Sequence, residues 1–321
     1  MAQLIAGIFY EAFANDWLQQ GNDQAAFEVP GGRMVMSTDS YVVSPLFFPG
    51  GDIGSLAVHG TINDVAMAGA RPLHLSASFI IEEGFALADL ERIAASMGAA
   101  SRAAGVPIVT GDTKVVERGK ADGVFITTTG IGIVPAGLDL SGDRARPGDV
   151  VILSGTIGDH GIAVMSKRQN LDFETQIVSD SAALHGLVAD IVTAAGPSLR
   201  AMRDPTRGGL AATLNELAHQ SGVGFRIDEE TIPVRPEVAA ACELLGLDPL
   251  HVANEGKLIA IIAPEGATAA LDAIKAHPLG REAAIIGAAI ADEAQFVQMV
   301  TAFGGGRIVD WLSGEQLPRI C

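Results

Sequence analysis

Hydrophobic periodicity divides the chain into alternating helical and extended segments. Apolar residues recur at helical spacing in seven segments, which are residues 2–20, 56–69, 86–104, 181–195, 208–221, 235–245 and 265–277. Alternating or continuously apolar runs of strand length occupy nine others, which are residues 33–38, 73–81, 107–110, 123–134, 150–153, 223–228, 257–263, 283–290 and 295–301. Because the strand patterns alternate and are mixed with helices, they favour an α+β fold over a doubly wound parallel sheet.

A turn in the middle of the chain separates two such groups of elements. Arg146-Pro147-Gly148-Asp149 has turn chemistry and precedes the buried-type strand Val150-Val151-Ile152-Leu153. With 321 residues the chain is long enough for two domains of ordinary size. We therefore expect an N-terminal domain over residues 1–144 and a C-terminal domain over residues 145–306.

The remaining residues, 307–321, are expected to form a flexible tail that ends in Cys321. Three successive glycines, Gly304 to Gly306, precede it and predict a hinge. Fully extended, the tail would reach about 45–50 Å, enough to carry a thiol into a site elsewhere in the molecule. The alternative is a frayed end with an accidental cysteine.

Composition and charge limit the classes of function. The net charge of −17 opposes binding to a phosphate backbone, so we expect no nucleic-acid partner. With only two cysteines, no basic-then-apolar leader and no membrane-length apolar run, the sequence predicts a cytoplasmic protein without a membrane span.

Four aspartates lie beside small residues at the expected ends of elements or in loops. They are Asp39 in Thr-Asp-Ser, Asp64 in Asn-Asp-Val, Asp112 in Gly-Asp-Thr-Lys and Asp204 in Arg-Asp-Pro-Thr-Arg-Gly-Gly. Converging carboxylates suit Mg²⁺, which would clamp the phosphates of a nucleotide despite the acidic charge. Each alone is more typical of a turn or cap residue than of a metal ligand. No Walker-type phosphate loop occurs.

Two further polar residues have apolar flanks and could take part in chemistry. Lys114, two positions beyond Asp112, could neutralise a γ-phosphate, and Glu255 in Asn-Glu-Gly could act as a general base. The alternative for each is a surface ion pair. His59, His160 and His251 have no metal-ligand spacing and are expected to be loop or packing residues.

Together these motifs resemble the HypE family, the carbamoyl dehydratases of nickel–iron hydrogenase maturation, within the wider PurM-like (AIR synthase-related) ATP-binding superfamily. The resemblance covers nearly the whole chain. It is carried by residues 38–54, Gly111-Asp112-Thr113-Lys114-Val115-Val116, residues 204–210, Val252-Ala253-Asn254-Glu255-Gly256-Lys257 and Leu317-Pro318-Arg319-Ile320-Cys321. The terminal Pro-Arg-Ile-Cys is its most specific part.

The resemblance implies a homodimer in which the N-terminal sheets pair to form a β-barrel, with ATP in the groove beside the larger C-terminal domain. A partner, HypF, would place a carbamoyl group on Cys321. The chain would then dehydrate this S-carboxamide to a thiocyanate with ATP, and a HypC–HypD complex would receive the cyanide on iron.

The same resemblance assigns roles to individual residues. Asp39, Asp64, Asp112 and Asp204 would hold Mg²⁺, and these four together with Thr113 and Asn254 would bind the nucleotide. We predict that Lys114 assists at the phosphoryl or amide oxygen, that Glu255 transfers a proton, and that Cys321 carries the substrate.

One departure and two rival functions accompany the resemblance. The family begins with a glycine-rich segment of His-Gly-Ser-Gly-Gly type, whereas Met1-Ala2-Gln3-Leu4 enters the first predicted helix directly. Either the sequence is truncated here or its true start lies upstream, and the loop that would cover the phosphates is missing from it. Another PurM-like synthase remains possible, although a selenophosphate synthetase would need a reactive residue near its N-terminus. A non-catalytic thiol acceptor is the other rival.

Overall fold

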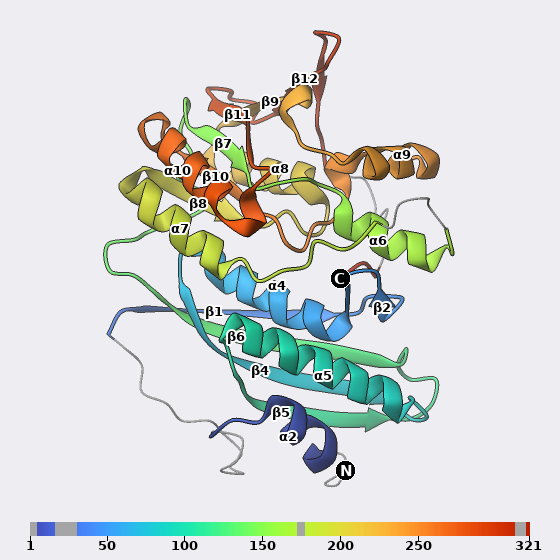
Figure 1. Cartoon of the computed structure of the whole chain (residues 1–321). Coiled ribbons are helices and arrows are strands. Elements are labelled where there is room, and N and C mark those ends of the chain that lie inside the picture. The colour runs from blue at the N-terminus through green and yellow to red at the C-terminus, as the bar shows by residue number, and fades with distance from the viewer. Residues whose placement is uncertain (1–4, 17–30, 172–176, 312–318) are drawn as a thin grey trace.

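Residues 5–16, 31–171, 177–311 and 319–321 are described by a computed structural model, and they contain two sheets with their own helices (Figure 1). The first sheet has four strands in the order β1-β6-β4-β5. Their bounds are β1 Arg33–Tyr41, β6 Val124–Val134, β4 Arg71–Glu82 and β5 Ile108–Val116. Since β4 and β5 run parallel while the other neighbours are antiparallel, the sheet is mixed.

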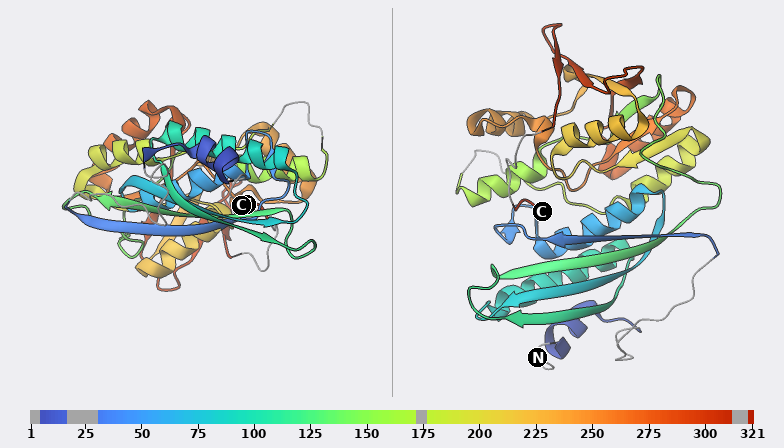
Figure 2. Two further views of the ribbon diagram at one scale, coloured as in Figure 1. Left: turned by 90° about the horizontal axis from the view of Figure 1, so that it is seen from below. Right: turned by 180° about the vertical axis from the view of Figure 1, so that it is seen from behind.

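Helices α4 (Ile53–Met67) and α5 (Leu87–Ala104) cover one face of this sheet (Figures 1 and 2). The Asp52 side chain caps α4 by accepting from the Gly54 and Ser55 amides at 2.7 and 3.1 Å. The alternation of β1 turns Tyr41 into the core beneath α4, where it is 1% exposed. Two short strands, β2 (Phe47–Phe48) and β3 (Gly51–Asp52), form the hairpin before α4.

The second sheet has seven strands in the order β13-β12-β9-β11-β7-β10-β8. Their bounds are β13 Gly306–Ile308, β12 Val297–Val300, β9 Gly224–Asp228, β11 Ala284–Ile290, β7 Val150–Leu153, β10 Ile259–Ile262 and β8 Leu199–Arg203. Helices α7 (His185–Ala195) and α10 (Pro264–Ala276) pack on the face bearing Ile152, and α8 (Gly209–Ser221) packs on the face bearing Val151 and Leu153. Each domain is therefore α+β, with a mixed sheet.

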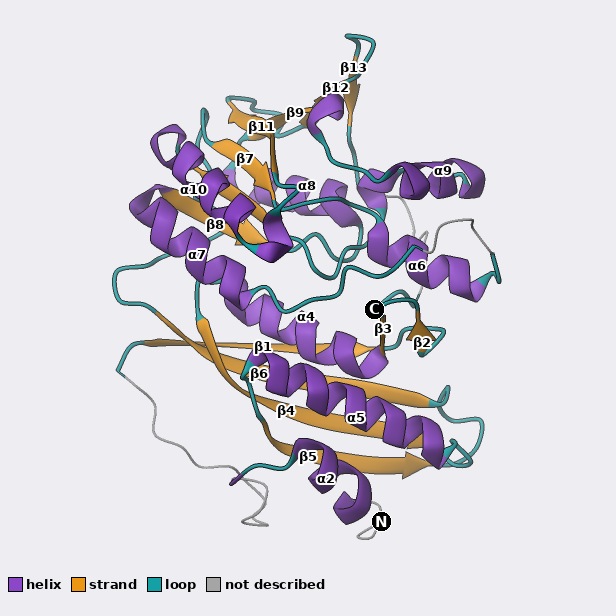
Figure 3. Cartoon of the chain, viewed as in Figure 1, coloured by secondary structure: helices purple, strands orange, loops and turns teal. Residues whose placement is uncertain are grey.

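One apolar cluster contains residues of both domains. It combines Phe79 of the first sheet with Ile162 of α6 (Asp159–Arg168) and Val238 of α9 (Pro236–Leu245). Ile320 of the C-terminal segment belongs to the same cluster. The last residues of the chain, 319–321, therefore lie at the contact between the domains (Figures 1 and 3).

The structure corrects several expected elements. The described part of the first helix comprises a π-helical turn, η1 (Ile5–Phe9), and the short α2 (Tyr10–Phe13); the end of the predicted helix, residues 17–20, lies outside the described residues. β5 extends through Asp112 and Lys114, which were expected to follow the strand. The elements α6, β8 and β13 were not predicted, because each is short or lacks a clear periodicity. The remaining 3₁₀ turns are η2 Gly196–Ser198, η3 Glu229–Thr231, η4 Pro249–His251 and η5 Pro278–Gly280.

The expected hinge at the three glycines is wrong. Gly304, with φ of +80°, forms the turn between β12 and β13, and the Thr301 amide donates to Gly305 O at 2.8 Å. Val309 is buried beyond this hairpin, and its amide donates to Val297 O. The glycines are therefore needed for a hairpin turn, and the chain stays attached to the second sheet as far as Val309.

No helix in the described ranges is both long and apolar enough to cross a membrane.

Candidate active site

Strand β1 and helix α4 present two of the predicted aspartates to one another. Ser37, Asp39 and Tyr41 share the face of β1 that is turned toward α4. The Ser37 hydroxyl donates to Asp64 Oδ2 on α4 at 2.7 Å. This bond fixes the Asp64 carboxylate beside the strand that carries Asp39.

The loop between β8 and α8 provides the third aspartate. Asp204 follows the last residue of β8, and Gly209 opens α8 with φ of +62°. A Cβ at Gly209 would lie 2.6 Å from the carbonyl oxygens of Leu250 and Val252, so only glycine permits this close approach. The Gly209 amide donates to Thr206 O, so it is engaged within the loop and does not offer its N–H to an anion.

A buried ion pair positions Glu255. Asp180 accepts from the Glu255 and Gly256 amides at 3.1 and 3.2 Å and from Lys257 Nζ at 3.0 Å. Asn63 of α4 donates to Glu255 O at 3.3 Å and thereby connects the loop to the first domain. The Asp180 carboxylate and the Asn63 side-chain amide thus hold the backbone of Glu255, although its own carboxylate remains available.

Asn254 has a structural role in this arrangement. Its side chain is fully buried, accepts from the Gly158 amide at 2.8 Å and donates to Pro205 O at 2.9 Å. It therefore holds the Glu255 loop against the Asp204 loop. The prediction that Asn254 binds the nucleotide remains untested, but its side-chain bonds are already made within the protein.

The C-terminal residues are docked between the domains. The amide of Val42 donates to the main-chain oxygen of Cys321, and that of Ser44 donates to Arg319 O, both at 3.1 Å. Arg168 donates to Arg319 O at 2.6 Å, and His160 Nε2 lies 2.9 Å from Ile320 O.

Side chains strengthen this docking. Ile320 is 4% exposed, and Arg319 donates to Val42 O while pairing with Asp122. His160 also contacts Ser179 Oγ and the edge of Phe48, so it is a packing residue, as expected, that in addition holds the tail.

These loops enclose a cavity of about 150 Å³. The predicted residues that line it are Asp39, Asp64, Asp204, Glu255 and Cys321. Ser40, Gly60, Thr206 and Arg207 complete much of the wall. The structure therefore brings a thiol and four carboxyl groups to one place from both domains and the tail.

Burial changes the acidity of these carboxyl groups. Desolvation, followed by the nearby Asp64 charge, raises the pKa of Asp204 to about 7. Desolvation and the Asp204 charge raise the pKa of Glu255 well above its ordinary value, and desolvation raises that of Asp64. Like-charged acids buried together favour protonation or the binding of a cation.

The donor set fits a magnesium nucleotide. Asp204 Oδ2 and Glu255 Oε1 are buried and have no hydrogen-bond partner in the parts of the chain that the structure describes. Within those same parts, no three His, Cys, Asp or Glu residues are close enough to form a complete metal site. Mg²⁺ commonly uses one or two carboxylates together with phosphate oxygens and water, so carboxylate oxygens open to a ligand are the appropriate donors.

Asp112, Thr113 and Lys114 do not join this cavity. They lie on β5, at the opposite edge of the sheet from β1. The pairing of Ser78 with Asp112 and of Ile80 with Lys114 places both charged residues on the sheet face turned away from α4 and α5. There Asp112 and Lys114 form an exposed ion pair at 3.1 Å, so the expectation that they converge with Asp39 within one chain is not met.

The match to known families agrees with this site. Residues 21–134 match the AIR synthase related protein, N-terminal domain, and residues 146–300 match its C-terminal domain. Carbamoyl dehydratase HypE of Rhizobium leguminosarum bv. viciae is 78% identical over 321 residues, which are 100% of this chain and 92% of that protein. The chain belongs to the HypE family. HypE of Escherichia coli K12 is 45% identical, covering 100% of this chain and 96% of its own.

Solved HypE structures share the whole fold. A HypE in complex with ATP superposes with a TM-score of 0.96 at 52% identity, covering 100% of this chain and 96% of that one. The chain from a HypE–HypF complex gives 0.85 at 49% identity, with 96% and 99% covered. A thiamine-monophosphate kinase from Stenotrophomonas maltophilia gives 0.66 at 19% identity, with 88% and 89% covered, and shares the fold alone.

Several positioning residues escaped the sequence analysis. Asp180, Lys257 and Asn63 form the framework beneath Glu255, and Arg168 holds the tail. Lys257 falls in the motif Asn-Glu-Gly-Lys, which was a usable signal. Asp180 stands between two serines in a segment without regular structure, and nothing in its neighbourhood distinguishes it.

Proposed function

We propose that this chain, as a carbamoyl dehydratase of nickel–iron hydrogenase maturation, converts a carboxamide on Cys321 Sγ into a thiocyanate at the expense of ATP. The observation that carries the proposal is the shared cavity of Cys321, Asp39, Asp64, Asp204 and Glu255. A thiol beside acids that attract a cation-bound nucleotide suits a reaction in which the thiol-bound group is phosphorylated.

The chemistry balances with ATP as the only co-substrate. The carboxamide oxygen attacks the γ-phosphorus and ADP leaves, while one N–H proton is lost. The C–O bond then breaks with its electron pair going to phosphate, and loss of the second N–H proton leaves S–C≡N. Phosphorylation is needed because an amide oxygen is otherwise a poor leaving group.

The residues of the cavity have separate tasks in this scheme. The carbonyl of Cys321 is fixed by Val42, which limits the directions open to its side chain. Glu255 takes the amide proton, since burial makes its carboxylate a stronger base than an exposed glutamate. Asp39, Asp64 and Asp204 would share Mg²⁺ with the phosphates of the nucleotide, and the bound cation would neutralise charge at the phosphates and favour the ionised form of Glu255.

A homodimer would supply Asp112, Thr113 and Lys114 from the partner. β1 and β5 are the two edges of the first sheet, and its uncovered face carries Met34 and Met36, which are 58% and 71% exposed (Figure 2). Joining two such sheets into a barrel would place β5 of one chain beside β1 of the other. The partner's edge would thereby approach the cavity that its own chain's β5 does not reach.

The proposed reaction requires one partner that supplies its substrate and another that receives its product. HypF, which forms a complex with HypE in a solved relative, would load the carbamoyl group, and HypC–HypD would take the cyanide. The setting we propose is the cytoplasm, in agreement with the two cysteines, Cys242 and Cys321, which form no disulfide.

Replacement of the thiol tests the proposal. Incubation of the parent with the carbamoylating partner and Mg-ATP should give a C-terminal peptide that loses the mass of one water molecule, as read by mass spectrometry. Cys321→Ala should give no nitrile while retaining its fold, and Cys242→Ala, which removes the buried cysteine, should behave like the parent. A nitrile from Cys321→Ala would refute the proposal, and a carboxamide that persists in the parent would indicate a non-catalytic acceptor.

A further inference from the structure

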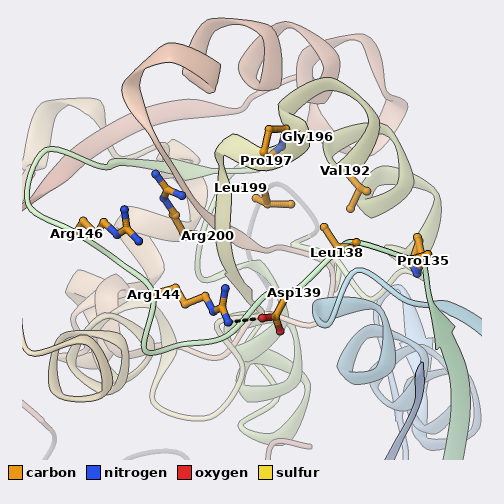
Figure 4. Close-up of a pocket in the computed structure, with 12 residues that line it drawn as sticks. Pro135, Leu138, Asp139, Arg144, Arg146, Val192, Gly196, Pro197, Leu199 and Arg200 are labelled. Carbon is orange, nitrogen blue, oxygen red and sulfur yellow. Dashed lines mark hydrogen bonds and ion pairs between the residues drawn. The ribbon is translucent and has the colours of Figure 1, made fainter. Parts of the chain in front are cut away.

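A second cavity, of about 430 Å³, lies where the two domains are joined (Figure 4). One part of its wall is the connection that follows β6, residues 135–146. The other part comes from the end of α7, the turn η2 and the start of β8, residues 192–200. It shares no lining residue with the cavity that holds Cys321.

Three arginines line this cavity. Arg144 and Arg146 come from the connection and Arg200 from β8, and Figure 4 draws them on the side opposite Val192 and Pro135. Arg144 pairs with Asp139. No ion pair of Arg146 is found among the residues that the structure describes.

Arg200 is incompletely satisfied. Its Nε is buried, lies 3.7 Å from Asp149 Oδ2 and makes no hydrogen bond in the described ranges. That oxygen already accepts from the Arg146 amide at 2.8 Å. The Nε donor therefore lacks an acceptor, which is costly for a buried polar atom, while the Arg200 side chain, 23% exposed, lines the cavity.

Positive charge is in excess here although the chain as a whole carries −17. Arg33 also pairs with Asp139, at 3.2 Å, so the one carboxylate in the lining is shared with a further arginine, while three arginines line the cavity. An anion repelled by most of this surface is attracted to this region. The planar, forked donors of arginine suit phosphate in particular.

We propose that this cavity binds a small organic phosphate of about the size of a mononucleotide. Leu138, Val192, Pro197 and Leu199 offer an apolar wall to the body of the ligand, and the arginines hold its phosphate. The volume is within the range of small-molecule sites, about 300–1,000 Å³, and exceeds what inorganic phosphate alone would fill. A ligand here contacts both the interdomain connection and β8, the strand that precedes Asp204.

Calorimetry with adenosine 5′-monophosphate, in EDTA, tests this site on the intact protein. Without divalent cations the acidic cavity repels phosphate, so binding reports on the arginines. The parent should bind this nucleotide about tenfold or more tightly than adenosine, and Arg146→Gln/Arg200→Gln should lose about tenfold or more in affinity. Asp64→Asn, in the other cavity, should leave the affinity unchanged.

The control removes two exposed arginines elsewhere, Arg226→Gln/Arg281→Gln, and so changes the net charge equally. Arg146→Gln alone, at an exposed residue, provides a variant that keeps its fold and should show part of the loss. The proposal is overturned by no binding to the parent at millimolar nucleotide, by equal affinities of the double variant and the control, or by inorganic phosphate binding as tightly as the nucleotide.

Discussion

The cavity that is lined by Cys321 contains buried acidic side chains. Without a ligand, their burial lowers the stability of the folded chain. A carboxylic acid whose pKa is raised on folding binds its proton more tightly in the folded state than in the unfolded state. For Asp204 the pKa is about 7 when folded and 3.8 ordinarily, so the unfolded chain releases the proton first as pH rises. This residue therefore costs the protein stability between about pH 4 and 7, and the full cost is reached above that window.

Asp204→Asn should remove this cost. At pH 8 without ligand we expect the free energy of unfolding to rise by an amount on the order of 2–4 kcal/mol, and its decrease between pH 4 and 7 to become shallower. Urea unfolding across this pH range measures both effects. Asp272→Asn, at an exposed residue of α10, is the control. Matching pH profiles for the parent and Asp204→Asn would show that Asp204 is not the group responsible.

For single residues, the sequence identified the candidates for the chemistry better than it identified the residues that position them. Asp39, Asp64, Asp204, Glu255 and Cys321 were predicted and share one cavity, because each stands in a short motif of small and polar residues. Asp180 could not be predicted, since its role depends on a contact with Glu255 across 75 positions. Such a contact cannot be inferred from the spacing of residues along the sequence.

Among the elements, the docked tail is balanced between binding and release. Burying a side chain such as Ile320 is worth about 1.5–3 kcal/mol, whereas ordering the backbone costs about 1–2 kcal/mol for each residue. Ordering three residues therefore costs more than the burial of Ile320 returns, and the hydrogen bonds from Arg168, Val42 and Ser44 decide the outcome. Breaking these bonds would release the thiol for the loading and delivery proposed above.

Arg168→Gln should favour the outward position. It removes a bond from a charged donor to Arg319 O, and such bonds contribute about 1.5–3 kcal/mol. Alkylation of Cys321 by iodoacetamide should accelerate roughly tenfold, measured by mass spectrometry against the buried Cys242. Lys167→Gln removes the neighbouring, exposed charge and should have little effect. Equal alkylation rates in the two variants would exclude Arg168 as a tail clamp.

Element prediction succeeded where periodicity was strong and failed where neighbours decided the conformation. The helix over 86–104 and the strand over 123–134 were placed within one or two residues of their observed ends. The three glycines were assigned to a hinge because glycine permits many conformations. The strand pairing of β13 with β12 selects one of them, and this pairing cannot be inferred from the glycines.

For the whole molecule, the proposed homodimer would reunite charged residues that one chain places at two sheet edges. One chain carries Asp39 on β1 and Lys114 on β5, with two strands between them. The sequence predicted the family, and with it the two α+β domains, whereas the dimer stays a prediction. It could not show on which side of the sheet Lys114 lies, because that depends on the register between β4 and β5.

Mixed dimers test whether Lys114 acts across the interface. Lys114→Ala and Cys321→Ala chains should each be inactive, yet their heterodimer should form nitrile, because the second chain supplies Lys114 to the first chain's Cys321. Lys114→Ala combined with Lys114→Ala/Cys321→Ala serves as the control and should stay inactive. If both mixtures are equally inactive in the mass-spectrometric assay, Lys114 does not act in trans.

The attachment of Val309 to the second sheet sets a limit on where the thiol can be loaded. Val309 is buried and bonded to Val297 and Asn215, so any displacement of the thiol would have to start beyond it. Eleven residues lie between Val309 and Cys321, a distance of about 40 Å when the chain is fully extended. Any enzyme that modifies the thiol must place its own active site within that radius of Val309. Residues inserted between Val309 and Cys321 would widen the range of docking positions from which a partner can reach the thiol. Deletions there would first exclude the partners whose active sites lie farthest from Val309.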